Sequence, residues 1–315
     1  MSGALKVGTR GSELAMAQCA ALAERFDAEV ELVPITTQGD TDRSSLQQIG
    51  GTGVFVSALR DALLEGRVDV AVHSMKDLPT APAEGIELAA VSKREDARDA
   101  LCARDGLTFA ELPEGAKVGT GSPRRMAQLR LARPDLDVVD LRGNVPTRLA
   151  RAQGPDADLD AVVLALAGLK RLGLEDRATE VLDVIDFPTA PAQGALAVEV
   201  RAGDEAARKA VAPTDHASTR AAADAERRVL AGLEAGCAAP LAAHAEVADG
   251  MLFLTASAYA TDGSRKLTAS HAYTLDSTKP GELAEAARDV AERAVAELLE
   301  GGAADLVHEA RSSAD

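Results

Sequence analysis

The sequence predicts an α/β protein built from two related domains and a smaller α+β domain. Short runs of β-branched residues alternate with amphipathic helical patterns through the first two thirds of the chain, which is typical of parallel βαβ units. A strand-to-helix motif at 7–12 recurs at 118–122. After Asp215 the order of the predicted elements changes: helices and strands are grouped rather than alternating, which favours an α+β domain.

The first predicted domain begins with three strands separated by two helices. In chain order these are a strand at 5–8, a helix at 13–26, a strand at 30–36, a helix at 56–65 and a strand at 68–72. Leu14, Ala17, Ala21 and Leu22 repeat at helical spacing, whereas the strands are short β-branched runs. The elements therefore alternate as a parallel sheet requires.

The second and third domains follow from the same signals. The second contains a strand at Val118, a helix at 124–132, a strand at 138–139, a helix at 145–152 and a strand at 161–166. The third contains a helix at 217–230, strands at 252–260 and 267–275 joined by a turn at 261–264, and a helix at 281–299. Apolar and polar residues alternate on both sides of an Asp-Gly turn, which predicts that these two strands form a hairpin.

The recurring motif allows two interpretations. Val7-Gly-Thr-Arg-Gly-Ser12 and Val118-Gly-Thr-Gly-Ser122 each open a helix that contains Met-Ala-Gln. They are either two similar helix N-caps or the same unit in two related α/β domains that face a cleft.

Composition excludes several classes of protein. The chain has 315 residues and a formal net charge of −16, which opposes binding to a polyanionic nucleic acid. Aromatic residues make up 2% and Trp is absent, so no stacking surface for single-stranded bases is expected. The most apolar stretch, at 161–169, is far too short to span a bilayer, and nothing at the start of the chain predicts a signal peptide.

The three cysteines predict neither a disulfide framework nor a zinc site, because they are far apart and form no Cys-x-x-Cys pair. We therefore expect a cytoplasmic protein without a metal. Cys19 and Cys102 lie in apolar patterns and are predicted to fill the core. Cys237 lies in the loop segment Gly236-Cys-Ala-Ala-Pro240, where it is either incidental or a nucleophile or attachment point.

Arginines gather at strand-to-helix junctions in this acidic chain. Arg10 precedes a helix start, and Arg124 and Arg125 occupy the first turn of a helix, where a cation is unfavourable unless an anion binds there. Arg142 and Arg148 flank another helix start, and Arg171 follows a strand. Each one alone could be a solvated surface residue. Together they favour a ligand with several carboxylates or phosphates, which the guanidinium group binds in a bidentate manner.

A charged pair ends the predicted buried strand at 68–72. In the segment Val70-Ala-Val-His-Ser-Met-Lys76-Asp77, the carboxylate of Asp77 could cap a helix or pair with Lys76. Alternatively, it could act as an acid, a base or a stabiliser of a cation.

These segments together resemble the porphobilinogen deaminase family. The matching stretches, in family order, are Thr9-Arg-Gly-Ser12, Gly39-Asp40, Gly50-Gly-Thr-Gly-Val-Phe55, Ala71-Val-His-Ser-Met-Lys-Asp-Leu-Pro79, Arg94-Glu-Asp-Ala-Arg-Asp99, Gly119-Thr-Gly-Ser-Pro-Arg-Arg125, Leu141-Arg-Gly-Asn144, Ala167-Gly-Leu-Lys-Arg-Leu-Gly173, Pro191-Ala-Gln-Gly194 and Gly236-Cys237. Each stretch alone is weak evidence, but the ordered set is specific. Beyond Pro240 the resemblance is one of pattern only.

The resemblance implies a fold and its division. Two domains would be like type II periplasmic binding proteins with parallel-rich sheets, and a small α+β C-terminal domain would carry the cysteine loop. The implied ranges are 1–93 with 194–213 for domain 1, 98–189 for domain 2 and 217–315 for domain 3. The chain would cross to domain 2 near Arg94 and return near Pro191.

The resemblance also implies an activity. Members are transferases of tetrapyrrole and heme biosynthesis that condense four porphobilinogen molecules head to tail and release ammonia at each step. They then hydrolyse off hydroxymethylbilane. The primer is a dipyrromethane cofactor, which would be covalently held by Cys237. The chain would act as a monomer whose product passes to uroporphyrinogen-III synthase, with no nucleic-acid or membrane partner.

Roles for individual residues come from the same resemblance. Asp77 would be catalytic, contacting the pyrrole N–H groups and stabilising the azafulvene cation left when ammonia departs. Besides Cys237, the implied cofactor-binding residues are Lys76, Ser122, Arg124, Arg125, Arg142 and Arg148. The implied substrate-binding residues are Arg10, Ser12, Phe55, Arg171 and Gln193.

Several positions depart from the family pattern. Thr52 replaces a lysine of the glycine loop, Gln48 and Ser57 stand where many members have lysines, Gln38 replaces an arginine, and Pro146 replaces a glycine. These changes predict that the segment from Asp40 to Gly53 holds substrate carboxylates less strongly or closes differently.

Two other functions are compatible with the residues. A non-catalytic two-domain anion-binding protein would share the duplicated α/β architecture, because fold does not determine function. A different carboxylate-handling transferase could use Cys237 as a nucleophile. A covalently attached dipyrromethane would distinguish the family activity from both.

Overall fold

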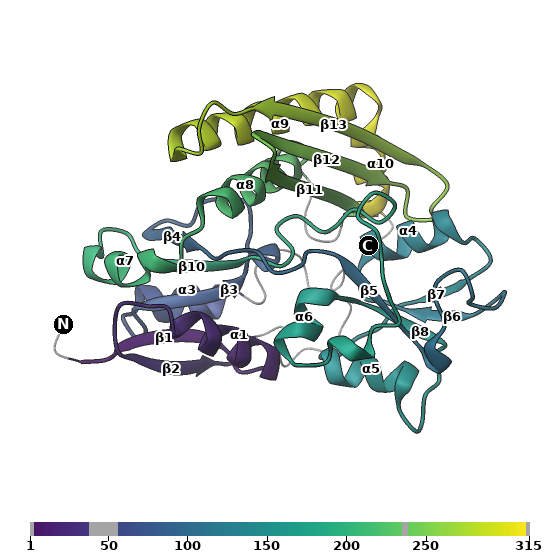
Figure 1. Cartoon of the computed structure of the whole chain (residues 1–315), viewed down its shortest axis with the longest axis horizontal. Helices are drawn as coiled ribbons and strands as arrows, with labels where there is room; N and C mark the ends of the chain where they lie inside the picture. Colours follow the sequence, from purple (N-terminus) through teal and green to yellow (C-terminus); the bar gives the residue numbers. More distant parts are fainter. Residues whose placement is uncertain (1–2, 38–55, 235–238, 313–315) are drawn as a thin grey trace.

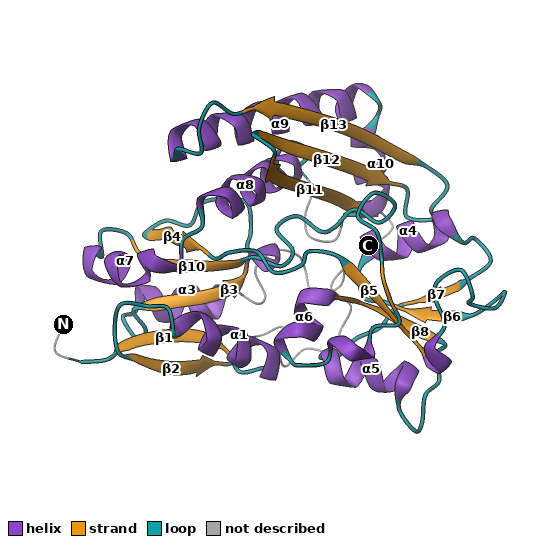
Figure 2. Cartoon of the chain, in the orientation of Figure 1, coloured by secondary structure: helices purple, strands orange, loops and turns teal. Residues whose placement is uncertain are grey.

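A computed structural model describes residues 3–37, 56–234 and 239–312 of the chain. It contains two five-stranded mixed sheets and a three-stranded antiparallel sheet, each accompanied by helices (Figures 1 and 2). The expectations for Phe55, Cys237, Gln38, Gln48, Thr52 and the Asp40–Gly53 segment lie outside the described residues.

The first sheet is built from both ends of the α/β region. Its strand order is β2-β1-β3-β10-β4. The strands are β1 (Leu5–Arg10), β2 (Val30–Ile35), β3 (Val70–Ser74), β4 (Ile86–Val91) and β10 (Leu196–Arg201). Its helices are α1 (Glu13–Ala23), α3 (Ser57–Leu64) and α7 (Glu205–Val211), with the 3-10 turns η1 (Met75–Asp77) and η4 (Ala212–Thr214). β1 pairs in parallel with β2 and β3, and β10 runs antiparallel to β3 and β4.

The second sheet has the strand order β7-β6-β8-β5-β9. Its strands are β5 (Asp99–Ala103), β6 (Lys117–Gly119), β7 (Asp137–Val139), β8 (Ala161–Ala165) and β9 (Glu180–Val181). Its helices are α4 (Pro123–Ala132), α5 (Val145–Gln153) and α6 (Leu166–Arg171), with the 3-10 turns η2 (Arg104–Gly106) and η3 (Glu175–Arg177). β6 pairs in parallel with β7 and β8, and β5 runs antiparallel to β8 and β9.

The two sheets have the same topology. In each, three parallel strands are followed by one antiparallel strand and then by an edge strand. The antiparallel strand is the first one after a crossover in both cases, β5 on entry to the second sheet and β10 on return to the first. The two Val-Gly-Thr motifs occupy β1 and β6, which are equivalent strands. The prediction of two related α/β domains is therefore confirmed.

The central strands β3 and β8 run from the buried core to the edge of each sheet where the parallel strands end. β3 and β8 read Val-Ala-Val-His-Ser and Ala-Val-Val-Leu-Ala, and in each strand only the last residue is not buried. Such continuous buried runs are expected of strands covered on both faces by helices. The residues that follow them emerge at the carboxyl ends of the parallel strands, where α/β proteins place their ligands.

The C-terminal region is an α+β unit, as predicted. Its strands β11 (Leu241–Ala248), β12 (Met251–Tyr259) and β13 (Lys266–Thr274) form an antiparallel sheet, with α8 (Ala217–Gly232), α9 (Pro280–Glu300) and α10 (Ala303–Ser312). Their apolar residues share one core that includes Val229, Leu254 and Val290. Figure 2 shows this sheet above the two α/β sheets.

Some elements differ from the sequence predictions. β11 was not predicted, because its alanine-rich sequence Leu-Ala-Ala-His-Ala-Glu-Val-Ala has a weak strand propensity; pairing with β12 along its length stabilises it instead. The strand predicted at 161–166 ends at Ala165, and α6 begins at once, so Arg171 lies at a helix end. The fold class is confirmed, whereas the predicted domain boundaries remain predictions. No described helix is long and apolar enough to cross a membrane.

Candidate active site

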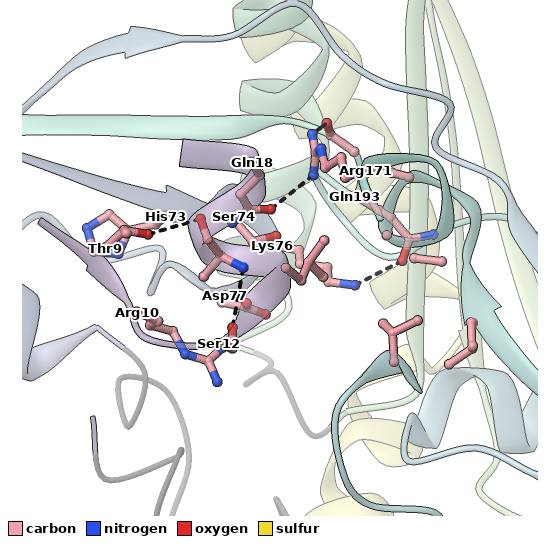
Figure 3. Close-up of a pocket in the computed structure, with 18 of the residues that line it drawn as sticks. Thr9, Arg10, Ser12, Gln18, His73, Ser74, Lys76, Asp77, Arg171 and Gln193 are labelled. Atoms are coloured by element: carbon pink, nitrogen blue, oxygen red, sulfur yellow. Dashed lines mark hydrogen bonds between the residues drawn. The ribbon is translucent and has the colours of Figure 1, made fainter. Parts of the chain in front are cut away.

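A cavity lies where the first sheet faces the helices of the second. Its lining includes Arg10 from the end of β1, Lys76 and Asp77 from η1 and Arg171 from α6 (Figure 3). Arg148 from α5 also lines it. The empty space is about 890 Å³, part of it open to solvent.

The lining is strongly cationic. Five of its described side chains are cations, namely Arg10, Lys76, Arg125, Arg148 and Arg171, whereas Asp77 is the one carboxylate in that described lining. The whole chain has a net charge of −16, so this concentration of positive charge is local. Such a cavity favours a ligand with several negative groups.

Asp77, in the turn after β3, has a carboxylate without a partner among the residues that the structure describes. β3 ends at Ser74 and the chain turns through η1, which directs both Lys76 and Asp77 to the cavity. Among the described residues, no donor hydrogen-bonds to this carboxylate and no cation lies within salt-bridge distance of it. Neither structural role considered for Asp77, as a helix cap or as an ion-pair partner of Lys76, is therefore observed in the described part of the chain.

Lys76 has an altered acidity. Its Nζ donates to Oε1 of Gln193 at 3.3 Å. Burial and the charge of Arg125 lower the pKa of Lys76 to about 8, although Asp77 and Asp99 act in the opposite direction. The ammonium group is thus close to neutralisation at mildly alkaline pH.

Ser12 and Ser122 cap equivalent helices. The Oγ of Ser12 accepts from the Ala15 amide at 3.3 Å at the start of α1, and that of Ser122 accepts from the Arg125 amide at 3.5 Å at the start of α4. Of the two, Ser12 lines the cavity. The motif is therefore both a helix cap and part of a repeated domain.

Arg124 and Arg125 share an internal anion that the sequence interpretation missed. The carboxylate of Asp99, at the start of β5, lies 2.7 Å from Nη2 of Arg124 and 2.6 Å from Nη2 of Arg125. Burial alone would raise the pKa of Asp99, but the two guanidinium charges outweigh it and hold that pKa well below its usual range. The anion expected at this helix start is thus the carboxylate of Asp99, the last residue of the 94–99 motif.

The two arginines differ in their access to the cavity. Arg125 lines it, whereas Arg124 does not and donates instead to Oε1 of Gln128 at 2.6 Å and to the Pro188 carbonyl at 2.9 Å. The Nε atoms of both arginines are buried and have no hydrogen-bond partner among the described residues.

Arg142 and Arg148 extend the cationic cluster. Burial, followed by the charges of Arg125 and Arg142, lowers the pKa of Arg148 to about 10. The Nε of Arg148 donates to the Gly143 carbonyl at 2.7 Å. Arg142 lies outside the described lining, 3.5 Å from the carboxylate of Asp140. Mutual repulsion among these cations would be relieved by an anionic ligand.

Arg171 is held by the first domain and by the second crossover. It donates to Oε1 of Gln18 at 3.3 Å and to the Gly194 carbonyl at 2.6 Å. Gly194 has a φ of +91°, and a Cβ there would lie 2.4 Å from the Glu95 carbonyl oxygen, so the two crossovers touch where only glycine fits. Gln18 was not predicted as a site residue, although the Met-Ala-Gln repeat contains it.

His73 is a second lining residue that the prediction missed. Its Nε2 lies 3.2 Å from the carboxylate of Glu199, which also accepts from Arg60 at 2.6 and 3.0 Å. Burial would raise the pKa of Glu199, but the adjacent His73 ring and the Arg60 guanidinium group lower it to about 2. The sequence did offer a signal for this residue, because His73 lies inside the 71–79 family motif.

Cys19 and Cys102 fill the core, as predicted. Both are fully buried, and burial raises the pKa of each thiol to about 12, so neither is a reactive thiolate. Within the described ranges, no group of His, Cys, Asp and Glu residues could hold a metal ion.

Comparison with known proteins identifies relatives over nearly the whole chain. The family model "Porphobilinogen deaminase, dipyromethane cofactor binding domain" matches residues 5–209, and "Porphobilinogen deaminase, C-terminal domain" matches 221–289. A porphobilinogen deaminase of Leifsonia xyli is 64% identical over 96% of this chain and 94% of the relative. That of Thermobifida fusca is 53% identical over 97% and 96%. The similarity therefore extends beyond Pro240, where the motifs end.

Solved structures resemble this chain only distantly. A YaeC-family lipoprotein of Enterococcus faecalis is 17% identical, with a TM-score of 0.38 over 66% of this chain and 88% of the other. An arginine-specific periplasmic binding protein of Salmonella typhimurium is 16% identical, with a TM-score of 0.36 over 67% and 90%. These values add nothing to the fold described above.

Proposed function

This chain belongs to the porphobilinogen deaminase family, and from that membership we propose which of its residues carry the reaction. It is a transferase of porphyrin biosynthesis that uses a dipyrromethane cofactor and polymerises porphobilinogen to hydroxymethylbilane. Four porphobilinogen units are joined head to tail, ammonia leaves at each step, and hydrolysis releases the product.

The assignment of the catalytic group rests on the position of Asp77, whose carboxylate lies in a cavity lined by five cations and has no partner in the described part of the chain. When the aminomethyl group of porphobilinogen leaves as ammonia, the C–N bond breaks and a cation remains that is delocalised onto the pyrrole nitrogen. A fixed carboxylate stabilises this charge, which develops only during the reaction. Asp77 faces the cavity and has no partner among the described residues, so it is free for this role.

The residues fit a dipyrromethane. This group has four carboxylates, and the buried Nε atoms of Arg124, Arg125 and Arg142 have no hydrogen-bond partner among the described residues. When bound, the cofactor supplies the free pyrrole α-carbon to which the first porphobilinogen is joined. We assign its attachment to Cys237 and its carboxylates to Lys76, Ser122, Arg124, Arg125, Arg142 and Arg148. Arg125 and Lys76 line the cavity, and we propose that they also bind carboxylates of the incoming porphobilinogen.

The remaining assignments concern the incoming porphobilinogen. Its acetate and propionate groups are bound by Arg10, Ser12 and Arg171, with Phe55 and Gln193 as further contacts. Arg10 and Arg171 enter the cavity from different domains, which supports a substrate held between them. Each coupling forms one C–C bond and releases the proton of the attacked α-carbon, so ammonia and the proton balance the step.

The organisation of the protein is also part of the proposal. Domain 1 comprises 1–93 and 194–213, domain 2 comprises 98–189, and domain 3 comprises 217–315. The enzyme acts in the cytoplasm as a monomer and passes its product to uroporphyrinogen-III synthase. The two crossovers near Arg94 and Pro191 provide the axis for any domain movement during elongation.

Intact-mass spectrometry of the purified protein tests the attachment. The wild type should carry the additional mass of one dipyrromethane, and the denatured protein should colour with Ehrlich's reagent. Cys237→Ser should lose both signals, whereas the control Cys102→Ala should keep them because that thiol is buried. A Cys237 that alkylates freely in active wild-type enzyme would refute the assignment.

A further inference from the structure

Asp99 binds three side chains and is almost completely enclosed. Its carboxylate is 1% exposed. One oxygen accepts from Nη2 of Arg124 at 2.7 Å, and the other accepts from Nη2 of Arg125 at 2.6 Å and from Nε2 of Gln193 at 2.8 Å. Asp99 itself is not among the residues that line the cavity, but Arg125 and Gln193 are.

The carboxylate determines which way the Gln193 amide points. Because an ionised carboxylate only accepts hydrogen bonds, the NH2 group of Gln193 must face it, and that group also donates to the Ala97 carbonyl at 2.6 Å. The amide oxygen is then turned toward two donors, Nζ of Lys76 and Nη2 of Arg125, each at 3.3 Å. A reversed amide would place donors against these two cations.

Asp99 is itself held firmly from the other side. Arg124 donates to Oε1 of Gln128 at 2.6 Å, and Gln128 donates to the hydroxyl of Tyr259 at 3.2 Å at the end of β12. Gln128 and Tyr259 are buried as well. A continuous buried chain of hydrogen bonds therefore runs from the third sheet to the turn that carries Lys76, and buried networks of this kind fix side-chain orientation.

We propose that Asp99 is a positioning residue for the known reaction: it orients Arg125 and, through Gln193, Lys76 toward the carboxylates of the pyrrole ligands. This inference depends on the proposed role of Arg125 and Lys76 in binding those carboxylates. The competing explanation makes Asp99 only a counter-ion that permits two arginines to be buried. The two explanations differ in what happens when the negative charge is kept but displaced.

The test measures KM for porphobilinogen, kcat per loaded chain and the fraction of chains that carry the cofactor by intact mass. Asp99→Asn should raise KM about tenfold to a hundredfold, as expected for losing oriented charged contacts, with kcat per loaded chain nearly unchanged. The loaded fraction should fall. Asp99→Glu keeps the charge and therefore remains foldable if the Asn variant does not, but it displaces the carboxylate and should also raise KM.

The control is Asp204→Asn, the same substitution at a carboxylate that pairs with Arg201 at 2.8 Å away from the described lining. It should leave KM and the loaded fraction unchanged. A wild-type KM in Asp99→Glu, or an equal rise in the control, would overturn the proposal. Arg125→Leu distinguishes a failure of the proposed ligand-binding role of Arg125 from a failure of the positioning role of Asp99. If Arg125→Leu and the Asp99 variants all have a wild-type KM, the ligand-binding role of Arg125 is refuted. If Arg125→Leu raises KM but the Asp99 variants do not, only the positioning role of Asp99 is refuted.

Discussion

At the scale of single residues, Arg124 and Arg125 are neighbours with different surroundings. Arg124 is 3% exposed, and its guanidinium group binds Asp99, Gln128 and the Pro188 carbonyl. Arg125 also binds Asp99 but reaches the cavity. Cofactor binding is proposed for both, and the internal contacts of Arg124 add a structural contribution at that position.

We therefore expect different effects of the same substitution at these positions. Arg124→Leu should lower the free energy of unfolding by about 3 kcal/mol, because it breaks a buried ion pair. Arg125→Leu should raise KM for porphobilinogen about tenfold or more, because a charge-assisted contact to ligand is lost. Denaturant unfolding and steady-state kinetics measure the two effects. A wild-type free energy of unfolding in Arg124→Leu would contradict the expected loss of stability. Unchanged turnover of Arg125→Leu at low porphobilinogen concentration would contradict the expected rise in KM.

Lys76 should respond to pH in a defined window. Its pKa is lowered to about 8, so it loses its proton as the pH rises through 8, whereas in the unfolded chain it does so near 10.5. Between these values the unfolded state binds more protons, so this residue makes the folded state more stable as the pH rises. The same change removes one positive charge from the cavity.

Competitive acetylation followed by peptide mass spectrometry measures this pKa. In Cys237→Ser protein, which would lack the cofactor, Lys76 should label half-maximally near pH 8. Asp99→Asn in the same background should shift the midpoint to lower pH, because the Asp99 carboxylate favours the ammonium form. A midpoint near 10.5 would show that the cavity does not perturb Lys76.

At the scale of elements, the turn η1 is supported by a helix of the third domain. Arg227 on α8 donates to the carbonyls of Leu78 at 2.8 Å and Pro79 at 2.7 Å, and more weakly to that of Met75 at 3.5 Å. These are the residues that flank Lys76 and Asp77. The planar guanidinium group of one arginine thus holds the backbone of the turn that carries Lys76 and Asp77.

Arg227→Lys should impair catalysis more than substrate binding. A lysine has no fork to hold both carbonyls, and a small displacement of a catalytic group costs about tenfold to a hundredfold in kcat. KM should change little. Arg228→Lys is the matched control, since the neighbouring Arg228 forms a surface ion pair with Asp224 at 2.7 Å. If the two variants have equal kcat, α8 does not position the turn.

Elements were predictable where local pattern and tertiary environment agree. β1, α1 and β3 were predicted within a few residues, because their apolar spacing matches the faces that they bury. β11 was missed because its stability comes from pairing with β12 rather than from its own residues. β10 was missed as a strand of the first sheet because its partners β3 and β4 are remote in sequence.

At the scale of the whole molecule, the cavity was predictable only in part. Cations at strand-to-helix junctions were visible in the sequence, and Arg10, Arg125, Arg148 and Arg171 do meet in one cavity. The pairing of Asp99 with both arginines was not visible, because it depends on how β5 enters the second sheet after the crossover. Local spacing carries no information about such long-range contacts.

We propose that the single carboxylate in the described cavity lining serves every condensation. In the described cavity lining, Asp77 stands alone among cations from both domains, and the growing chain supplies more carboxylates with each unit. Two unit charges about 4 Å apart at an effective dielectric near 20 interact by about 4 kcal/mol. If this interaction lowers the activation free energy by that amount, the rate rises about a thousandfold.

The turnover of Asp77→Asn tests this account most directly. The substitution keeps the size and one acceptor oxygen but removes the charge, so the protein should keep its thermal midpoint and bind porphobilinogen while its turnover falls about a thousandfold. Asp77→Glu, which retains a displaced charge, should keep measurable activity. Near-normal turnover of Asp77→Asn together with a lowered thermal midpoint would contradict the account and make Asp77 a structural residue.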